Sequence, residues 1–308
     1  MPASAATRNA HLSNYASGVS QDRMSALAEF IAPVVPTGIA HGQYKQFNEK
    51  NDFQIYDTNR AIGGPRNRIE FLASDPYFNA TPQGLETTID DHERDLAGER
   101  GLGRLQEAKI SNLIGACHHS HEKKVFDLIK AGKAATGSIG VWSTVDGSVE
   151  PIDEIDSQIE AIATEIGRMP NRIVFGLGAW RVFRNHPRVI NRTSGVTEKG
   201  VSTGMAASML LNPSMEIRVG VLSADSKKMG AAKTATNIVG AEVFIFYADD
   251  SPTQYDPSFA KTFSVDAGMI DSVREYREER NASDIYYVDW SEDIKVTSAA
   301  SGRRITLS

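Results

Sequence analysis

Apolar and polar residues alternate between residues 38 and 78, a pattern typical of β-strands with one exposed face. Turn sequences interrupt the alternation at 48–52 (NEKND) and 63–65 (GGP). The segment is too polar to form a core of its own. We therefore expect a long, exposed β-hairpin that needs a neighbour for stability. The apolar members of the alternation are Tyr44, Phe47, Phe53, Ile55, Ile69 and Phe71.

The apolar spacing becomes helical from about Leu85 to Lys133. Three early glycines, at 98, 101 and 103, predict kinked or irregular first turns, and Gly132 is a suitable stop. Beyond Gly103 we predict a long helix with one slowly drifting apolar stripe. The stripe consists of Leu105, Ala108, Leu113, Cys117, His121, Val125 and Leu128.

A second pattern, from 151 to 247, mixes helices with short apolar strands. The segment 151–167 (PIDEIDSQIEAIATEIG) predicts an amphipathic helix with Asp153 as N-cap and Gly167 as stop. Together these elements predict a compact α/β core. The others are a strand at 172–178, a helix at 179–190 broken near Pro187, a short helix around 206–211, and strands at 216–222 and 241–247.

The two ends of the chain differ from this core. Residues 1–30 are rich in Ala, Ser and Asn and are expected to form an extended arm, which Pro33 and Pro36 continue. The last 50 residues contain three segments of alternating polarity and no helix, so we predict an antiparallel sheet. The three segments are 262–268, 272–281 and 283–297.

Composition limits the possible functions. The chain has 308 residues, 41% of them hydrophobic, so it can bury a substantial core. Its net charge of −6 does not favour binding to nucleic acid through overall charge. A single cysteine cannot form an internal disulfide. Without a signal peptide or an apolar run of membrane-spanning length, we expect a soluble protein of a reducing compartment, or one assembled there.

One short run, GACHHSHEKK at 115–124, raises the possibility of a metal site. It holds the only cysteine, Cys117, with His118, His119 and His121, and thiolate and imidazole bind zinc and copper well. On a helix each residue turns about 100° from the last, so these four side chains cannot converge on one ion. We expect Cys117 to be buried, His121 to lie at the edge of the apolar stripe, and His118 and His119 to be more exposed. A metalloenzyme built on this run stays as an alternative.

Sequence motifs for other kinds of catalysis are incomplete or absent. Gly176 and Gly178 lie between a strand and a helix as in a dinucleotide-binding turn, but Arg181 occupies the position of the third small residue. No phosphate-binding loop or GxSxG nucleophile turn is present. We therefore expect no enzymatic activity and no cofactor. The arm, the hairpin and the long helix instead provide surface that neighbouring subunits would bury.

Several motifs, in order, resemble the major capsid protein of tailed bacteriophages, the HK-ninety-seven coat fold that encapsulin shells share. The most specific match is MPNRIVFGLGAWRVFRNHPRVINR at 169–192. In the closing segment, 291–306, Arg303 and Arg304 stand where the family usually has aromatic or apolar residues. The other matching segments are EFIAPVVPTG (29–38), DTNRAIGGPRNRIEF (57–71), HSHEKKVFDLIKAG (119–132) and GAEVFIFYADDSPTQYDPSFAKTFSV (240–265).

The resemblance implies an α+β fold with an N-terminal arm, an extended hairpin loop, a long spine helix, a peripheral antiparallel sheet and an α/β axial domain. It also implies that scaffolding is a separate protein or that an N-terminal segment has already been removed. The expected parts are the arm (1–36), the hairpin loop (37–80), the spine helix and first peripheral part (81–148), the axial domain (149–250) and the returning peripheral strands (251–308).

The function that the resemblance implies is structural. Subunits would self-assemble into hexamers and pentamers of an icosahedral shell around viral double-stranded DNA, first in the host cytoplasm and finally in the virion capsid. A scaffolding protein, a portal and a decoration protein are the other partners it implies, and no membrane is involved. The main alternative is an encapsulin-type cargo shell.

Two oppositely charged segments suggest one contact between subunits. Arg60, Arg66 and Arg68 surround the glycines of the hairpin tip, and no acidic residue lies among them. We predict that this basic set meets an acidic set of the next subunit, near the start of its long helix. The acidic set consists of Asp90, Asp91, Glu93, Asp95 and Glu99.

Overall fold

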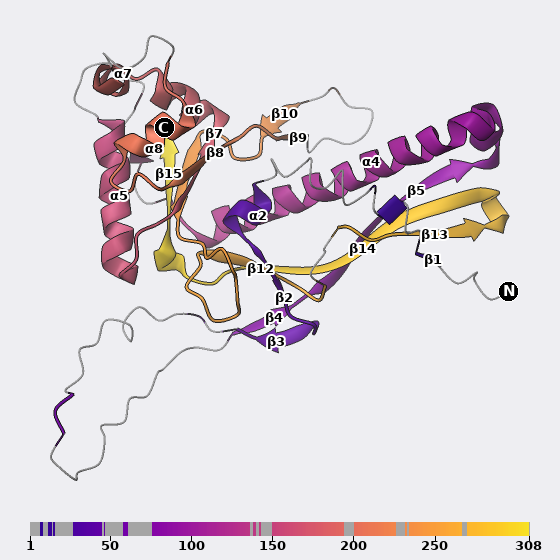
Figure 1. Ribbon diagram of the computed structural model, residues 1–308, viewed down its shortest axis with the longest axis horizontal. Coiled ribbons are helices and arrows are strands. Elements are labelled where there is room, and N and C mark those ends of the chain that lie inside the picture. The colour runs from indigo at the N-terminus through magenta and orange to yellow at the C-terminus, as the bar shows by residue number, and fades with distance from the viewer. Residues whose placement is uncertain are drawn as a thin grey trace. The chain divides into compact units, whose positions relative to one another are not determined.

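The computed structural model in Figure 1 divides into two compact units. Unit 1 comprises Met1–Gly42, Phe78–Leu128 and Thr262–Lys295. Unit 2 comprises Gln43–Tyr77, Ile129–Lys261 and Val296–Ser308. The structure describes residues 7–8, 12–13, 15, 27–44, 46, 58–60, 76–135, 138–139, 142, 150–193, 200–225, 232, 234–266 and 270–307.

A six-stranded sheet forms the frame of unit 1, with the order β1-β13-β14-β12-β2 and β5 paired with β14. The pairs β13–β14 and β14–β5 are antiparallel, which confirms the antiparallel prediction for that part of the chain. Strand β12 instead pairs in parallel with β2, from the N-terminal region. The strands are β1 (Thr7–Arg8), β2 (Val34–Pro36), β5 (Thr81–Asp90), β12 (Ala260–Ser264), β13 (Val273–Glu278) and β14 (Ser283–Val296).

The long helix α4 spans Asp91–Gly132 and, as predicted, ends at Gly132. Gly98 has φ 61° and ψ 173°, which confirms the predicted irregularity near the start. The predicted start near Leu85 was wrong, because the chain up to Asp90 is strand β5. β-Branched residues at 87–89 favour an extended backbone, and they pair with residues 284–286 of β14.

The core of unit 1 lies between α4 and the sheet. Ile110, Ile114 and Cys117 project from the helix onto Tyr286 and Val288 of β14. Alternate residues of β14 face this core, as the period-two pattern predicted. The short helix α2 (Ala28–Ile31) also belongs to unit 1.

Strands β3 (His41–Gln43) and β4 (Tyr77–Asn79) pair as a separate two-stranded sheet. They stand at the two ends of the segment for which a hairpin was predicted. Apart from residues 44, 46, 58–60 and 76, the segment between these strands lies outside the described residues.

Unit 2 is built on a five-stranded sheet with the order β6-β15-β11-β7-β8. The central strand β11 runs antiparallel to both β15 and β7, while β7–β8 and β15–β6 are parallel. A second pair, β9 (Ser223–Asp225) with β10 (Ala235–Asn237), is antiparallel. The five strands of the main sheet are β6 (Ser138–Ile139), β7 (Arg172–Gly176), β8 (Glu216–Gly220), β11 (Glu242–Phe246) and β15 (Gly302–Leu307).

Four helices accompany this sheet: α5 (Pro151–Ile166), α6 (Leu177–Arg184), α7 (Pro187–Thr193) and α8 (Thr203–Met209). The predicted break near Pro187 and the predicted stop at Gly167, which is left-handed with φ 65°, are confirmed. Asp153 is not the N-cap of α5, because Pro151 already occupies the first turn and Glu150 is the N-cap.

The core of unit 2 joins these helices to one face of the sheet. The isoleucine stripe of α5 packs with Trp180 and Phe183 of α6 and with Ile173 and Val243 of the strands. The rings of Trp180 and Phe183 stack with centroids 5.8 Å apart. The α/β core predicted from the sequence is therefore present, while its expected limits at 149 and 250 stay a prediction.

No helix among the described residues is long and apolar enough to span a membrane.

Candidate functional site

The Cys-His run lies in the middle of α4. Cys117 is fully buried in the core of unit 1, as predicted, and burial raises the pKa of its thiol to about 12. His118 and His119 are half-buried, which makes them more exposed than Cys117. Among the described residues, no group of three or more His, Cys, Asp or Glu side chains is arranged to hold a metal ion.

His121 was expected at the edge of the stripe, and that prediction was wrong. Its side chain is only 2% exposed, and Nδ1 lies 2.6 Å from Oε2 of Glu292, which is equally buried. Trp290 Nε1 donates to the same carboxylate at 3.0 Å, and Lys124 Nζ donates to its other oxygen at 2.7 Å. Burial alone would raise the pKa of Glu292, but His121, Lys124 and Trp290 together lower it to about 2. The carboxylate therefore joins α4 to β14 as a buried anion.

The next residue, Glu122, binds a different segment of the chain. It is 1% exposed, and its Oε2 accepts a hydrogen bond of 3.0 Å from the backbone N–H of Leu27, just before α2. Its Oε1 is buried without a hydrogen-bond partner. Burial raises the pKa of Glu122 to about 7, although the backbone hydrogen bond from Leu27 opposes the rise. Glu122 thus attaches the α2 segment to the long helix through a carboxyl group that titrates near neutral pH.

The acidic set predicted at the start of α4 is partly engaged inside its own unit. Asp91 receives two hydrogen bonds from the Arg277 guanidinium, at 2.7 and 2.5 Å, and Arg277 also binds Asp284 at 3.2 Å. Hydrogen bonding to Arg277 lowers the pKa of Asp91. Glu93 pairs with Lys109 at 3.1 Å. The Arg277 contacts thus fix the start of α4 to β13 and β14, whereas the Glu93–Lys109 pair lies within α4.

The other members of the charged sets have fewer contacts. Asp90 accepts a hydrogen bond of 2.8 Å from the backbone N–H of His92, and Asp95 is exposed. Glu99 belongs to α4, but its side chain is outside the described residues. In the basic set Arg60 is exposed, and Arg66 and Arg68 lie outside the described residues. The predicted contact between the two sets thus stays a prediction.

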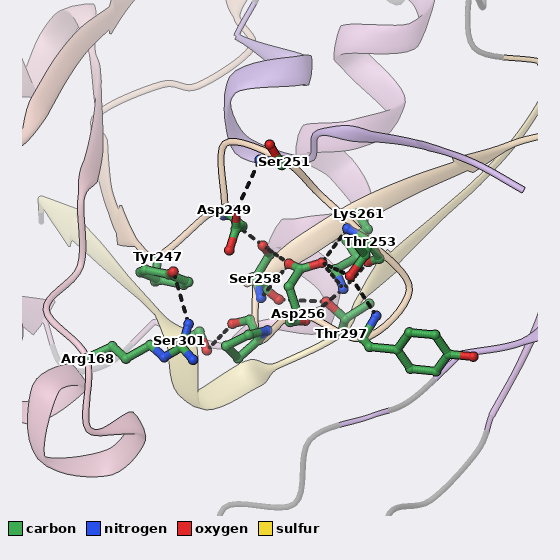
Figure 2. Close-up of polar contacts among 12 residues, drawn as sticks. Arg168, Tyr247, Asp249, Ser251, Thr253, Asp256, Ser258, Lys261, Thr297 and Ser301 are labelled. Carbon is green, nitrogen blue, oxygen red and sulfur yellow. Dashed lines mark hydrogen bonds and ion pairs between the residues drawn. The ribbon is translucent and has the colours of Figure 1, made fainter.

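A buried lysine holds a loop of unit 2 that the sequence analysis did not single out (Figure 2). Lys261 is 0% exposed, and its Nζ lies 2.9 Å from Asp256 Oδ1. The same ammonium donates at 2.7 Å to the backbone oxygens of Thr253 and Asp256. Three acceptors around one cation compensate for its removal from water.

Asp256 organises the rest of this loop. It accepts a hydrogen bond of 2.6 Å from the backbone N–H of Thr253 and two more from the N–H and hydroxyl of Ser258. Burial would raise the pKa of Asp256, but the hydrogen bonds from Ser258, Lys261 and Thr253 outweigh it and lower the pKa. Thr297 Oγ1 donates to the backbone oxygen of Ser258 at 2.6 Å.

The loop presents an aromatic side chain at its surface. Tyr255 is 63% exposed between the anchored residues Thr253 and Asp256. Figure 2 also shows Arg168, which lies over the Tyr247 ring at 5.6 Å and donates to its hydroxyl at 3.2 Å. A rigid loop with an exposed tyrosine is suited to a protein contact, because little conformational entropy is lost when it binds. In the sequence, the only indication of this anchored loop was that Asp256 and Lys261 lie close together.

Comparison with known proteins finds similarity to phage capsid proteins. No family model matches the sequence. The chain is 28% identical over 253 residues to the major capsid protein of Burkholderia phage BcepMu, covering 76% of this chain and 78% of that protein. The chain is similar to phage major capsid proteins, as the motifs predicted.

Solved structures agree with the predicted fold. A phage-related protein from Bordetella bronchiseptica superposes with a TM-score of 0.74 at 20% identity, covering 99% of this chain and 98% of that one. The putative capsid protein of an E. coli prophage gives a TM-score of 0.53 at 10% identity, covering 99% of this chain and 100% of that one. The fold is the HK-ninety-seven coat fold, which confirms the predicted fold class.

Proposed function

We propose that the chain is the repeating subunit of an icosahedral phage shell, in which it forms hexamers and pentamers around double-stranded DNA. The observation that supports this most directly is the sequence similarity to a phage major capsid protein over three quarters of the chain. The role is structural rather than catalytic, and its final location is the virion capsid. An encapsulin-type shell would have the same fold, so the fold does not decide between the two; the phage sequence relative favours the capsid.

Assembly of the purified protein tests this proposal. We expect light scattering and negative-stain electron microscopy to show capsomers or closed shells, alone or with a scaffolding protein from the same phage. A monodisperse monomer of the chain mass, 33.6 kDa, at every concentration and salt tried would contradict the proposal. A scaffolding protein, a portal and a decoration protein stay predictions that co-expression with neighbouring phage genes can test.

We also propose that the basic set Arg60, Arg66 and Arg68 contacts the acidic start of α4 in a neighbouring subunit. Two of the acidic residues there already have cationic partners in their own unit, so the contact would add to an existing charge network. Single exposed pairs contribute only about 0–1 kcal/mol. The contact repeats in every subunit, however, so its effect on the whole shell is multiplied.

Charge reversal tests this contact. We expect the triple variant R60E/R66E/R68E to fold normally and to assemble poorly, and we expect reversal of the acidic set to restore part of the assembly. The matched control is the triple lysine variant, which keeps the positive charge. Shells of normal size and heat resistance from the glutamate variant would show that backbone and apolar contacts hold the tip.

A further inference from the structure

Helix α6 borders a hollow at the surface of unit 2 that nothing in the described chain fills. The hollow has a volume of about 600 Å³, and its lining includes Leu177, Trp180 and Asn237. Leu177 is 42% exposed at its edge, and Trp180 closes it toward the core with only 9% of its surface exposed. The floor is therefore apolar.

Two arginines give this hollow a positive rim. Arg181 and Arg184 line it, both are exposed, and neither takes part in an ion pair with another described residue. They are three positions apart on one helix, where like charges repel each other. Their place in the last turn suits the helix dipole, but the mutual repulsion remains unless an anion lies close by.

Helix α5 carries the opposite arrangement. Asp156 and Glu160 are four positions apart, so they are neighbours of like charge on one helix face. Glu160 is exposed and has no ion-pair partner among the residues that the structure describes. Beside them Leu211 is 48% exposed, and its backbone N–H donates to Asp156 Oδ1 at 2.8 Å. This face thus combines an exposed leucine with two carboxylates that form no ion pair within the described chain.

The carboxylates at the start of α5 are already neutralised. Glu150 binds Arg188 at 2.7 Å and Arg192 at 3.0 Å, and Arg192 also binds Asp153 at 2.7 Å. This network contains two acidic and two basic side chains, so it leaves no net charge.

The two other carboxylates of α5 also have partners inside unit 2. Glu165 binds the Arg303 guanidinium, and Glu154 accepts a hydrogen bond of 2.6 Å from Trp142 Nε1. Asp156 and Glu160 are therefore the acidic pair of this helix that forms no ion pair with a described residue, although the Arg192 charge also acts on Asp156.

The two faces belong to different helices of unit 2. Figure 1 shows α5 along one side and α6, with the nearby strand pair β9–β10, toward the other. A ring of identical subunits needs two different faces of this kind, because each copy meets one neighbour with one face and the other neighbour with the second.

We propose that the α6 face of one copy docks on the α5 face of the next copy around a capsomer ring. This inference rests on the proposed function. The occupant of the hollow is a second copy of this chain: its Leu211 packs against the apolar floor, and its Asp156 and Glu160 neutralise Arg181 and Arg184. Each helix thereby exchanges a repulsion between like charges for an attraction between opposite ones.

A charge-swap experiment tests the docking. The variant R181E/R184E opposes negative charges on both faces, and like charges in contact are costly, so we expect the concentration needed for assembly to rise by about tenfold or more. The variant D156N/E160R should have a similar effect when alone, and the D156N side chain keeps an amide oxygen for the Leu211 N–H. Combining the two variants should restore assembly. The control R181K/R184K keeps both charges and should assemble like the wild type.

Circular dichroism and melting temperature must show that each variant folds, and a second measurement does not depend on charge. The double variant L177C/L211C should give a ladder of disulfide-linked oligomers under mild oxidation, while each single variant gives dimers at most. Cys117 is buried and does not interfere.

The outcomes separate this inference from the proposed function. A wild type that never assembles overturns the proposed function and the contact with it. A wild type that assembles, together with normal assembly of R181E/R184E or no ladder from L177C/L211C, overturns only the contact. Recovery of assembly in the combined variant supports it.

Discussion

Glu122 makes the attachment of the N-terminal α2 segment depend on pH. Its side chain is 1% exposed, and burial raises its pKa from an ordinary 4.5 to about 7. Between these two values the folded chain binds a proton that the unfolded chain has released. The free energy of unfolding therefore falls as the pH rises through this interval.

The size of the effect follows from the pKa difference. Each pH unit in the interval changes the free energy of unfolding by about 1.4 kcal/mol, so the full change is about 3 kcal/mol. The variant E122Q has no titrating group at this position. We expect it to be similar to the wild type at about pH 5 and more stable by up to about 3 kcal/mol at about pH 8.

Urea unfolding of the unassembled protein at several pH values measures this difference. The two proteins differ only at residue 122, so the difference between their pH profiles reports the change at Glu122. Hydrogen exchange gives a local measurement, because the Leu27 amide donates directly to Glu122. In the wild type its protection should fall as the pH rises, after correction for the intrinsic exchange rate. Equal pH dependence of stability in the wild type and E122Q would refute the reasoning.

Three further predictions concern buried groups. The variant K261M should lose about 3–5 kcal/mol of stability in urea unfolding, because it leaves the Asp256 carboxylate without its buried cation; a loss below about 1 kcal/mol would contradict this. The variant G302A should lose about 1–3 kcal/mol in the same assay, because a Cβ there would lie 2.3 Å from the Phe259 ring; a normal melting temperature would show that the ring can move. Cys117 should resist a thiol reagent in the folded protein and react on unfolding, because burial raises the pKa of the thiol to about 12; fast reaction of the native chain would count against its burial.

The local sequence was sufficient wherever one residue type decides the backbone. Gly132 and Gly167 end helices, and the break before Pro187 falls where proline has no N–H to donate. The isoleucine spacing of α5 predicted its buried face, because that face repeats with the period of the helix. The ordered family motifs also predicted the fold, which the structural comparisons confirm.

The sequence was not sufficient where a partner from far along the chain decides the outcome. Residues 85–90 were predicted as helix, but pairing with β14 makes them a strand, and the β-branched residues at 87–89 favour the same extended backbone. Contacts between subunits are the extreme case, because the other half of each contact lies on another molecule, and so the charged sets stay predictions.

Charged residues inside the fold show the same division. The sequence by itself determined that α4 carries an apolar stripe with a cysteine in it, because that follows from spacing alone. Only the tertiary structure decided that His121 is buried against Glu292, that Glu122 binds the Leu27 backbone, and that Asp256 pairs with the buried Lys261. A buried charge is tolerated only where partners surround it, and those partners come from segments that folding brings together.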